Sequence, residues 1–369
     1  AMAQCLDAGY QAVLMAPTTV LAVQHEQTLA ALFAPLGVDV ALLTGSSRAS
    51  ERKKINNRLH SGTLRLLIGT HALLSDDVQF SRLGLAIVDE QHRFGVRQRW
   101  ALTEKGGAIH LLAMSATPIP RTLALGLYDD LAMTVMRGMP AGRLPVETRV
   151  LSAQGRGALA AGIQRLLDQN AYCYWITPRI DDDDVSVMKR AEALRGHFPH
   201  AGVQALHGRM KAAEKNQALA DFTAGRCRLL VATTVVEVGV NVPEARLIVI
   251  EDADCYGLAQ LHQLRGRVGR SNQQAYCVLM PAPNATAAAV QRLQYLVQYH
   301  DGLTLAELDL ELRGSGDAMG VQQSGVVGFR VLDWMEDAPL IRQAHTQTVD
   351  VSLPPVMRNF WRPVSDAVD

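Results

Sequence analysis

An internal repeat without gaps constrains the fold of this chain more than any other feature of its sequence. Residues 44–73 and 207–236 align at a constant offset of 163 residues. The offset pairs identical residues along the whole stretch: Gly45 with Gly208, Glu51 with Glu214, Gly62 with Gly225, Arg65 with Arg228, Leu66 and Leu67 with Leu229 and Leu230, and Thr70 with Thr233. Any two βαβ segments share part of this pattern by chance, but an alignment that needs no gap favours two copies of one α/β unit.

Short, continuous apolar runs alternate with amphipathic stretches of helical length in both halves of the chain. The runs that we expect to form strands are 12–17, 40–45, 64–70, 85–90 and 110–117 in the first half, and 172–178, 203–208, 228–234, 245–252 and 275–281 in the second. Uninterrupted apolarity indicates strands that are buried on both faces, as in a parallel sheet covered by helices. The sequence therefore predicts an α/β fold with two doubly wound parallel sheets.

Gly- and Pro-rich stretches and changes in composition predict the domain boundaries. We expect a first domain at 1–137, a linker at 138–148, a second domain at 149–284, two helices with a glycine-dotted loop at 285–335, and a peripheral tail at 336–369. The first residues are typical of the end of a helix that runs into a buried strand. We therefore expect the chain to begin inside its first domain.

Composition excludes several classes of function. Hydrophobic residues make up 48% of the 369 residues and the formal net charge is zero, so bulk charge does not indicate a nucleic-acid partner. Aromatic residues make up only 5%, which argues against bases stacked on aromatic platforms. The five cysteines form no CxxC pair, and no apolar run reaches membrane-spanning length. We expect a monomeric, cytoplasmic protein without membrane contacts.

One apolar run stops at two adjacent carboxylates, Asp89 and Glu90, and continues through Gln91 and His92. A strand that leaves the core through an ordinary polar turn is the alternative explanation. Because doubly wound sheets bind ligands at the carboxyl ends of their strands, we expect a nucleotide here. Asp89 would hold Mg²⁺, directly or through water, and Glu90 would polarise the water that attacks the γ-phosphate. Gln91 and His92 would report the state of the nucleotide to the other domain.

Residues 258–270 (LAQLHQLRGRVGR), in the second half of the chain, carry arginines whose positive charge complements the carboxylates of Asp89 and Glu90. Their spacing predicts a helix that carries Gln263, Arg267 and Arg270 on one face. Guanidinium groups on such a face can neutralise the charge that develops in phosphoryl transfer. The alternative is a solvated, arginine-rich helix end.

Turns that carry hydroxyl groups follow several other predicted strands. Ser115, Ala116 and Thr117 are expected to relay the state of the nucleotide to the acidic turn, with Thr117 capping a helix. His25 lacks the second histidine of a zinc-protease motif and is expected to be an ordinary helix-face residue. Hydroxyl groups and backbone amides at strand ends can also bind nucleic-acid phosphates, for which the candidates are Pro17, Thr18, Thr70, His71, Thr233 and Thr234.

Five stretches resemble the motor of RecG proteins, a family of bacterial ATP-dependent DNA helicases of superfamily 2. The resemblance extends to about residue 335. They are DEQHRFGV from Asp89, SATPIPRTLA from Ser115, LHGRMKAAEK from Leu206, ATTVVEVGVNVP from Ala232 and GLAQLHQLRGRVGR from Gly257. The resemblance implies two RecA-like domains that use ATP and Mg²⁺ to translocate on branched duplex DNA, reversing replication forks and migrating Holliday junctions. It also implies nucleotide contacts from Glu237 and Gly239, and DNA contacts from Arg121, His207 and Gly208.

Residues 308–325 resemble the translocation motif of the same family, a helical hairpin and loop that couple motor closure to DNA movement. The resemblance assigns this coupling to Arg313, Gly314 and Gly316, and Asp317 also matches. Gln322 stands where the family commonly carries Arg, and Asn241 replaces a frequent Asp.

Three other functions stay open at this point. A translocase of the transcription-repair coupling type has related motifs, but usually carries Glu where Gln91 stands. A non-catalytic DNA-binding module would need neither the acidic nor the arginine motif. A small-molecule α/β enzyme would need a nucleophile and base together, and the sequence shows no such combination.

No G-x-x-x-x-G-K-[ST] phosphate loop occurs in the 369 residues, whereas the RecG family carries one just ahead of a helix like the first residues here. We expect a polypeptide of these residues alone to hydrolyse ATP negligibly, because no such loop cradles the β- and γ-phosphates. Phosphate release with and without branched DNA is the measurement. DNA-stimulated turnover of about 1 s⁻¹ or faster would contradict the prediction.

Overall fold

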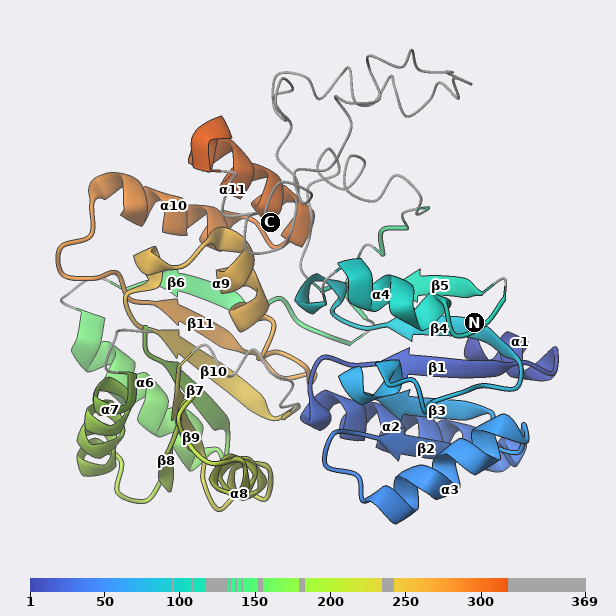
Figure 1. The fold of residues 1–369 in the computed structure, drawn as a ribbon. Helices are drawn as coiled ribbons and strands as arrows, with labels where there is room; N and C mark the ends of the chain where they lie inside the picture. The colour runs from blue at the N-terminus through green and yellow to red at the C-terminus, as the bar shows by residue number, and fades with distance from the viewer. Residues whose placement is uncertain are drawn as a thin grey trace, which may run out of the picture. The chain divides into compact units, whose positions relative to one another are not determined.

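Each half of the chain folds into its own parallel β-sheet in this computed structural model (Figure 1). The structure describes residues 1–94, 96–107, 109–116, 132, 134–136, 138–140, 142–151, 155–178, 183–233 and 242–317. Every strand predicted from the sequence is present, which confirms the predicted fold class of two doubly wound α/β domains.

The first sheet has the strand order β2-β3-β1-β4-β5, and every neighbouring pair is parallel. Its strands are β1 (Gln11–Met15), β2 (Val40–Leu43), β3 (Leu66–Gly69), β4 (Leu83–Val88) and β5 (His110–Ala113). Its helices are α1 (Met2–Asp7), α2 (Thr19–Phe33), α3 (Ala49–His60) and α4 (Val96–Thr103), with short 3-10 turns η1 (Ala34–Leu36), η2 (His71–Leu74) and η3 (Gln91–Arg93).

Alternate residues of β1 bury their side chains against different helices. Ala12 and Leu14 share one apolar cluster with α1 and α2, while Val13 and Met15 share another with α3 and α4. Every residue of β1 is buried, which explains the apolar run that follows Gln11. Helices therefore cover both faces of the sheet, as a doubly wound fold requires.

The second sheet has the strand order β6-β11-β10-β7-β9-β8 and is also parallel throughout. Its strands are β6 (Glu147–Val150), β7 (Tyr172–Ile176), β8 (Val203–Leu206), β9 (Leu229–Ala232), β10 (Ala245–Ile250) and β11 (Tyr276–Leu279). Its helices are α6 (Arg156–Asp168), α7 (Asp183–His197), α8 (Ala212–Thr223) and α9 (Leu258–Arg265), with the 3-10 turn η6 (Ala253–Cys255). Helices α6 and α7 share a core cluster with one face of this sheet, and Phe222 of α8 packs on Tyr174 from the other.

The two sheets repeat one topology. Taken from its other edge, the second sheet has the order β8-β9-β7-β10-β11, which corresponds to β2-β3-β1-β4-β5. The backbone amide of Thr70 donates to Leu43 O, and that of Thr233 donates to Leu206 O. The duplication that the offset of 163 residues predicts is therefore present in both the strand order and the backbone hydrogen bonds.

Strand β6 is an element that the sequence patterns do not predict, and its first residues fall in the expected linker. It lies at the edge of the second sheet and pairs there with β11. Thr148 is its buried residue, whereas Arg149 is exposed. Such an edge strand lacks the continuous apolar run that marks the central strands.

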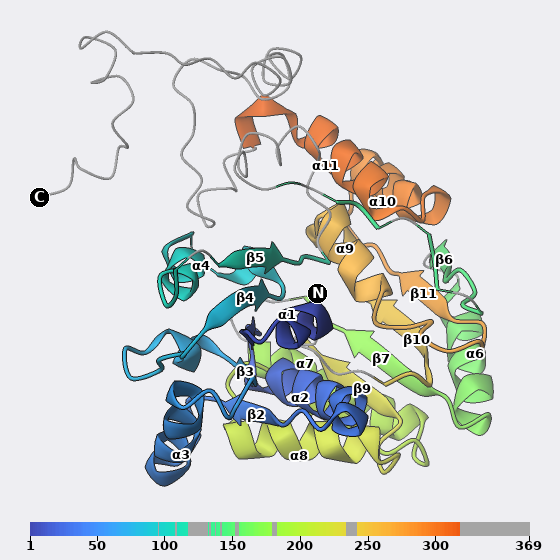
Figure 2. The ribbon, with the colours of Figure 1, turned by 90° about the vertical axis from the view of Figure 1, so that its right-hand side faces the viewer.

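Two further helices, α10 (Ala287–Gln298) and α11 (Gly302–Asp317), confirm the helical pair predicted after the second domain. α10 lies alongside α9 (Figure 2). The glycine-dotted loop predicted after these helices does not begin before residue 318, because α11 continues through Asp317. Propagation of an existing helix outweighs the low helix propensity of Gly314 and Gly316 near its end. In the ranges that the structure describes, no helix is long and apolar enough to cross a membrane.

Gly69 ends β3 at a position with no room for a side chain. A Cβ atom there would lie 2.2 Å from the carbonyl oxygen of Leu43 and 2.9 Å from Leu73 Cγ. We expect Gly69→Ala to lower the free energy of unfolding by about 1–3 kcal/mol, because the backbone must move.

Gly162→Ala in α6 is the matched control for that substitution. A Cβ atom on Gly162 meets no neighbouring atom within 4 Å, so this variant should be more stable by about 0.5–1 kcal/mol. Urea unfolding measures both variants. Equal effects of the two substitutions would show that the close approach at Gly69 is unimportant.

Candidate functional site

Backbone hydrogen bonds to two neighbouring strands fix the acidic turn that follows β4. The Asp89 amide donates to Met15 O at the end of β1, and the Gln91 amide donates to Met114 O just past β5, each at 2.9 Å. Between them Glu90 has φ 51°, in the left-handed region. Residues other than glycine rarely adopt this conformation, and such strain concentrates at functional sites. The turn lies at the carboxyl edge of the sheet, where the sequence predicts ligand binding.

His25 lies on helix α2, as the sequence predicts, and its side chain also contacts the acidic turn, which no sequence pattern indicated. Its Nε2 atom lies 2.7 Å from Oδ2 of Asp89, while Oδ1 of Asp89 accepts the Glu90 amide at 2.9 Å. Both side chains are partly buried, with 29% of His25 and 19% of Asp89 exposed. A motif cannot reveal this contact, because 64 residues separate the pair and only the fold brings α2 to the turn.

Asp89 suits a magnesium ion whose other ligands are phosphate oxygens and water. Each carboxylate oxygen accepts one hydrogen bond and retains a lone pair for a metal or a metal-bound water. Within the described ranges, no cluster of three His, Cys, Asp or Glu side chains could hold a metal by itself. Mg²⁺ commonly binds through one or two carboxylates, with phosphates and water as its other ligands, and Asp89 fits that pattern.

The second sheet carries an acidic turn with the same backbone geometry. The Glu251 amide donates to Ile176 O and the Ala253 amide donates to Met280 O, each at 2.9 Å. Asp252 has φ 44°, as Glu90 has φ 51° in the first turn. Glu251 is therefore the counterpart of Asp89, and Asp252 is the counterpart of Glu90. Sequence reasoning missed this equivalence.

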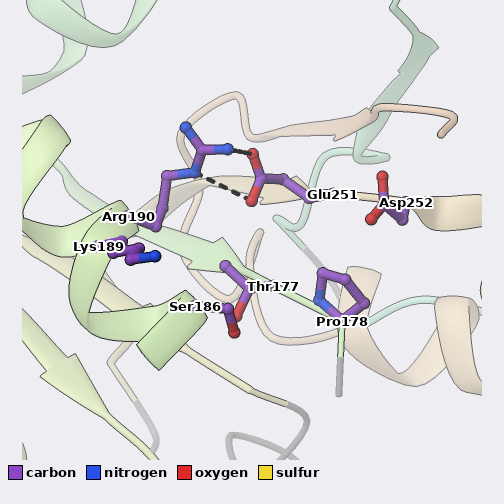
Figure 3. Close-up of a pocket in the computed structure, with 7 residues that line it drawn as sticks. All are labelled: Thr177, Pro178, Ser186, Lys189, Arg190, Glu251 and Asp252. Atoms are coloured by element: carbon purple, nitrogen blue, oxygen red, sulfur yellow. Dashed lines mark hydrogen bonds and ion pairs between the residues drawn. The ribbon is translucent and has the colours of Figure 1, made fainter. Parts of the chain in front are cut away.

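An arginine binds the carboxylate of the second turn. Arg190 of α7 contacts Glu251 twice, through Nη2 to Oε1 at 2.6 Å and through Nε to Oε2 at 3.1 Å (Figure 3). Burial raises the pKa of Glu251, and Arg190 opposes the rise. The two side chains line a pocket of about 340 Å³ together with Thr177, Pro178, Ser186, Lys189 and Asp252. The guanidinium of Arg190 therefore neutralises the negative charge of Glu251 in the wall of this pocket.

The arginine motif departs from the predicted helical face. α9 ends at Arg265, Gly266 is its C-cap, and Gly269 has φ 73°. The prediction of one continuous helix through Arg270 is wrong, because glycines favour helix ends and left-handed conformations. Gln263 lies on α9, whereas Arg267 and Arg270 belong to the turn beyond it, which we call the arginine turn (residues 266–270).

Arg270 is a partly buried cation that lies close to other cations. Burial and the neighbouring Arg267 lower the pKa of Arg270, Tyr174 opposes this shift, and Arg143 adds to it. Grouped guanidinium groups repel one another, and a phosphate relieves that repulsion with charge-assisted hydrogen bonds. The geometry of the arginine turn therefore suits an anionic ligand.

The linker packs directly against the arginine turn. A Cβ atom on Gly269 would lie 2.8 Å from Val146 Cγ2, and Gln274 Nε2 donates to Pro145 O at 3.0 Å. These contacts explain how Arg143, which sequence reasoning did not single out, comes near Arg270. Its position in a Gly- and Pro-rich linker gave no signal of that proximity.

Arg265 holds α9 to the end of α10. It is only 4% exposed and donates to the carbonyl oxygens of Leu296, Tyr299 and His300 at 2.7, 3.1 and 3.2 Å. Burial lowers the pKa of this guanidinium. Carbonyl groups at a helix C-terminus have no partner within the helix, so Arg265 caps α10. The sequence analysis assigned no role to this residue.

The other predicted site residues fall into three groups. Thr70 and Thr233 are 3% and 1% exposed at equivalent strand ends, and Thr18 caps α2 by accepting the Leu21 amide at 3.3 Å. Six residues are exposed or partly buried: Pro17, His71, Ser115, Ala116, His207 and Gly208. Gln91 and His92 lie in the 3-10 turn η3, and Arg313, Gly314 and Gly316 lie in α11. Thr117, Arg121, Thr234, Glu237, Gly239, Asn241 and Gln322 lie outside the described residues.

Known families and folds identify the class of protein. A family model described as DEAD/DEAH box helicase matches residues 1–125, and one described as helicase conserved C-terminal domain matches residues 165–272. The structure of S. cerevisiae Dbp5 L327V bound to RNA and ADP BeF3 has a TM-score of 0.58 at 16% identity, and the match covers 82% of this chain and 78% of that chain. The two sheets have the fold of the two-domain helicases.

Closer relatives narrow the class to one family. ATP-dependent DNA helicase RecG of Acidithiobacillus ferridurans is 45% identical over 340 residues, which are 91% of this chain and 50% of the relative. The Bacillus subtilis RecG is 42% identical over 368 residues, which are 98% of this chain and 53% of the relative. A solved structure of RecG bound to a three-way DNA junction has a TM-score of 0.73 at 39% identity, covering 90% of this chain and 44% of that chain. The chain belongs to the RecG family and spans about half the length of the curated relatives it matches.

The Arg190–Glu251 contact predicts how Glu251 titrates. Because burial outweighs Arg190, the Glu251 carboxyl should titrate above its ordinary pKa, and Arg190→Leu should raise that pKa further. Carboxyl carbon shifts followed by NMR against pH provide the measurement. Arg226→Leu, which removes the exposed partner of Asp221, is the control and should leave Glu251 unchanged. A lower pKa in Arg190→Leu would contradict the assignment.

Proposed function

We propose that this chain is the motor part of an ATP-dependent DNA helicase that acts on branched duplex DNA. The observation that carries the proposal is the Asp89–Glu90 turn, in which two carboxylates are fixed at the carboxyl edge of a parallel sheet and one has a strained backbone. The RecG relatives are named ATP-dependent DNA helicases, and the RecG structure contains a three-way DNA junction. Both facts support the extension to this chain.

In the proposed mechanism the acidic turn acts on the γ-phosphate of ATP. Asp89 would hold Mg²⁺, which supplies charge neutralisation to the phosphates when it is bound. Glu90 would orient a water molecule for attack on the γ-phosphorus and take up its proton, while the bond to the β-phosphate oxygen breaks and ADP leaves. Gln91 and His92 would respond to the loss of the γ-phosphate.

The second domain would contribute the cations. Arg267 and Arg270 would neutralise the charge that develops on the transferred phosphoryl group, with Gln263 on the adjacent helix. Glu237 and Gly239 would complete the nucleotide contacts. The crowding of Arg270 by other cations supports this assignment, because an approaching triphosphate removes the repulsion.

DNA would be held at the equivalent ends of β3 and β9. Thr70 and Thr233 are buried at matching positions in the two sheets, so we assign them to holding the strand ends that meet two phosphates, whose spacing would change on closure of the two domains on ATP. The remaining candidates for this surface are Pro17, Thr18, His71, Arg121, His207, Gly208 and Thr234. Coupling would pass through residues 115–117 and through the stretch that begins with Arg313, Gly314 and Gly316.

Glu90→Gln tests the hydrolytic role in a longer form of the protein that includes the family's phosphate loop. We expect ATP turnover to fall by about 10²-fold or more with nucleotide affinity retained, because an amide cannot accept the proton. Asp252→Asn is the matched control at the equivalent position of the second turn and should keep most of the turnover. Full turnover in Glu90→Gln would refute the assigned role.

The same protein allows a test of the DNA substrate. ATP turnover should be stimulated more by a three-way junction than by a linear duplex of the same length and composition. Equal stimulation would argue for a general duplex translocase of the transcription-repair coupling type. DNA binding without any ATP turnover would argue for a non-catalytic module.

A further inference from the structure

We propose that His25 is a positioning residue for Asp89, whose imidazole orients the carboxylate toward nucleotide-bound Mg²⁺. This inference rests on the proposed ATP site and extends it to a helix that no motif assigned to nucleotide chemistry. His25 lies on α2, well away in sequence from the acidic turn, and reaches Asp89 Oδ2 at 2.7 Å.

Two hydrogen bonds, one to each carboxylate oxygen, fix the orientation of the Asp89 carboxylate plane. Oδ1 accepts the amide of Glu90 and Oδ2 accepts from His25. Rotation about the last side-chain bond of an aspartate is otherwise broad, so one bond to each oxygen is the minimum that fixes the orientation. Without His25, Oδ2 of Asp89 would lose its hydrogen bond. The carboxylate could then rotate, and its lone pairs would no longer point toward the cation.

The second acidic turn shows what a different partner does at the same place. Arg190 comes from α7, the helix that follows β7 as α2 follows β1, and it contacts both oxygens of Glu251. A guanidinium is permanently charged and matches a carboxylate fork, so Arg190 neutralises Glu251 and donates to both of its oxygens. His25 instead contacts a single oxygen of Asp89 through one ring nitrogen. The two helices hold matching positions, but a permanently charged side chain neutralises the carboxylate at Glu251 alone.

Partners of this kind measurably tune metal sites. Residues that hydrogen-bond to metal ligands typically change metal affinity or activity by about 10–100-fold when removed. The expected signature is therefore a change in the Mg²⁺ requirement, with little change in nucleotide affinity when the metal is absent. A merely structural histidine would change neither quantity selectively.

The experiment uses the longer form that includes the phosphate loop and compares His25→Leu, His25→Gln and Asp89→Asn. Binding of a fluorescent ADP analogue is titrated with Mg²⁺ at equilibrium and repeated in EDTA. His25→Leu should raise the Mg²⁺ concentration for half-maximal effect by about 10–100-fold without changing affinity in EDTA. His25→Gln, whose amide nitrogen reaches to the position of Nε2, should recover to within a few-fold of the wild type.

His60→Leu on the exposed end of α3 is the matched control and should behave as the wild type. An unchanged Mg²⁺ requirement in a folded His25→Leu variant, or a Gln variant no better than Leu, would overturn the proposal. If His25→Leu does not fold, His25→Asn replaces it. Its shorter amide should need a higher Mg²⁺ concentration for half-maximal effect than His25→Gln. Equal Mg²⁺ requirements in the Asn and Gln variants would overturn the proposal. If Asp89→Asn leaves the Mg²⁺ requirement unchanged, the proposed ATP site itself fails.

Discussion

The parallel pairing of β1 with β4, repeated by β7 with β10, is the constraint on which the candidate site depends. In each sheet the last carbonyl of the inner strand accepts the amide of the first acidic residue, from Asp89 to Met15 and from Glu251 to Ile176. Main-chain groups therefore fix both turns. A substitution of either carboxylate leaves these two backbone hydrogen bonds in place, although Oδ1 of Asp89 also accepts the Glu90 amide.

The two turns share a backbone and differ in electrostatics. Glu251 is largely buried, with 12% of its side chain exposed, and the bidentate contact with Arg190 offsets part of its cost of burial. Asp89 instead has one ring nitrogen and one backbone amide as partners. A duplicated unit can thus hold a structural ion pair in one copy and an available carboxylate in the other. The difference lies in the order of the two carboxylates in each turn and in the partner side chain, His25 of α2 against Arg190 of α7.

Sequence patterns predicted the parts of the fold that rest on continuous burial. Central strands such as β3 are apolar along their length, so their runs stand out, and a repeat without gaps exposed the duplication. Edge strand β6 did not stand out, because one face of an edge carries polar side chains. The acidic turn was predicted since carboxylates after an apolar run are rare. His25, Arg190 and Arg265 were missed, because each acts across distant parts of the chain and leaves no local pattern.

The end of α9 at Arg265 gives neighbouring arginines opposite surroundings. A helix continued through Arg270 would place three side chains on one face, but Gly266 and Gly269 stop it. Arg265 is consequently buried against the carbonyl groups at the end of α10, while Arg267 and Arg270 form a turn against which the linker packs. The arginine turn therefore lies between two restrained contacts: Arg265, which is bonded to the end of α10, precedes it, and Val146 of the linker packs against its Gly269. These contacts restrain the backbone from which Arg267 and Arg270 project.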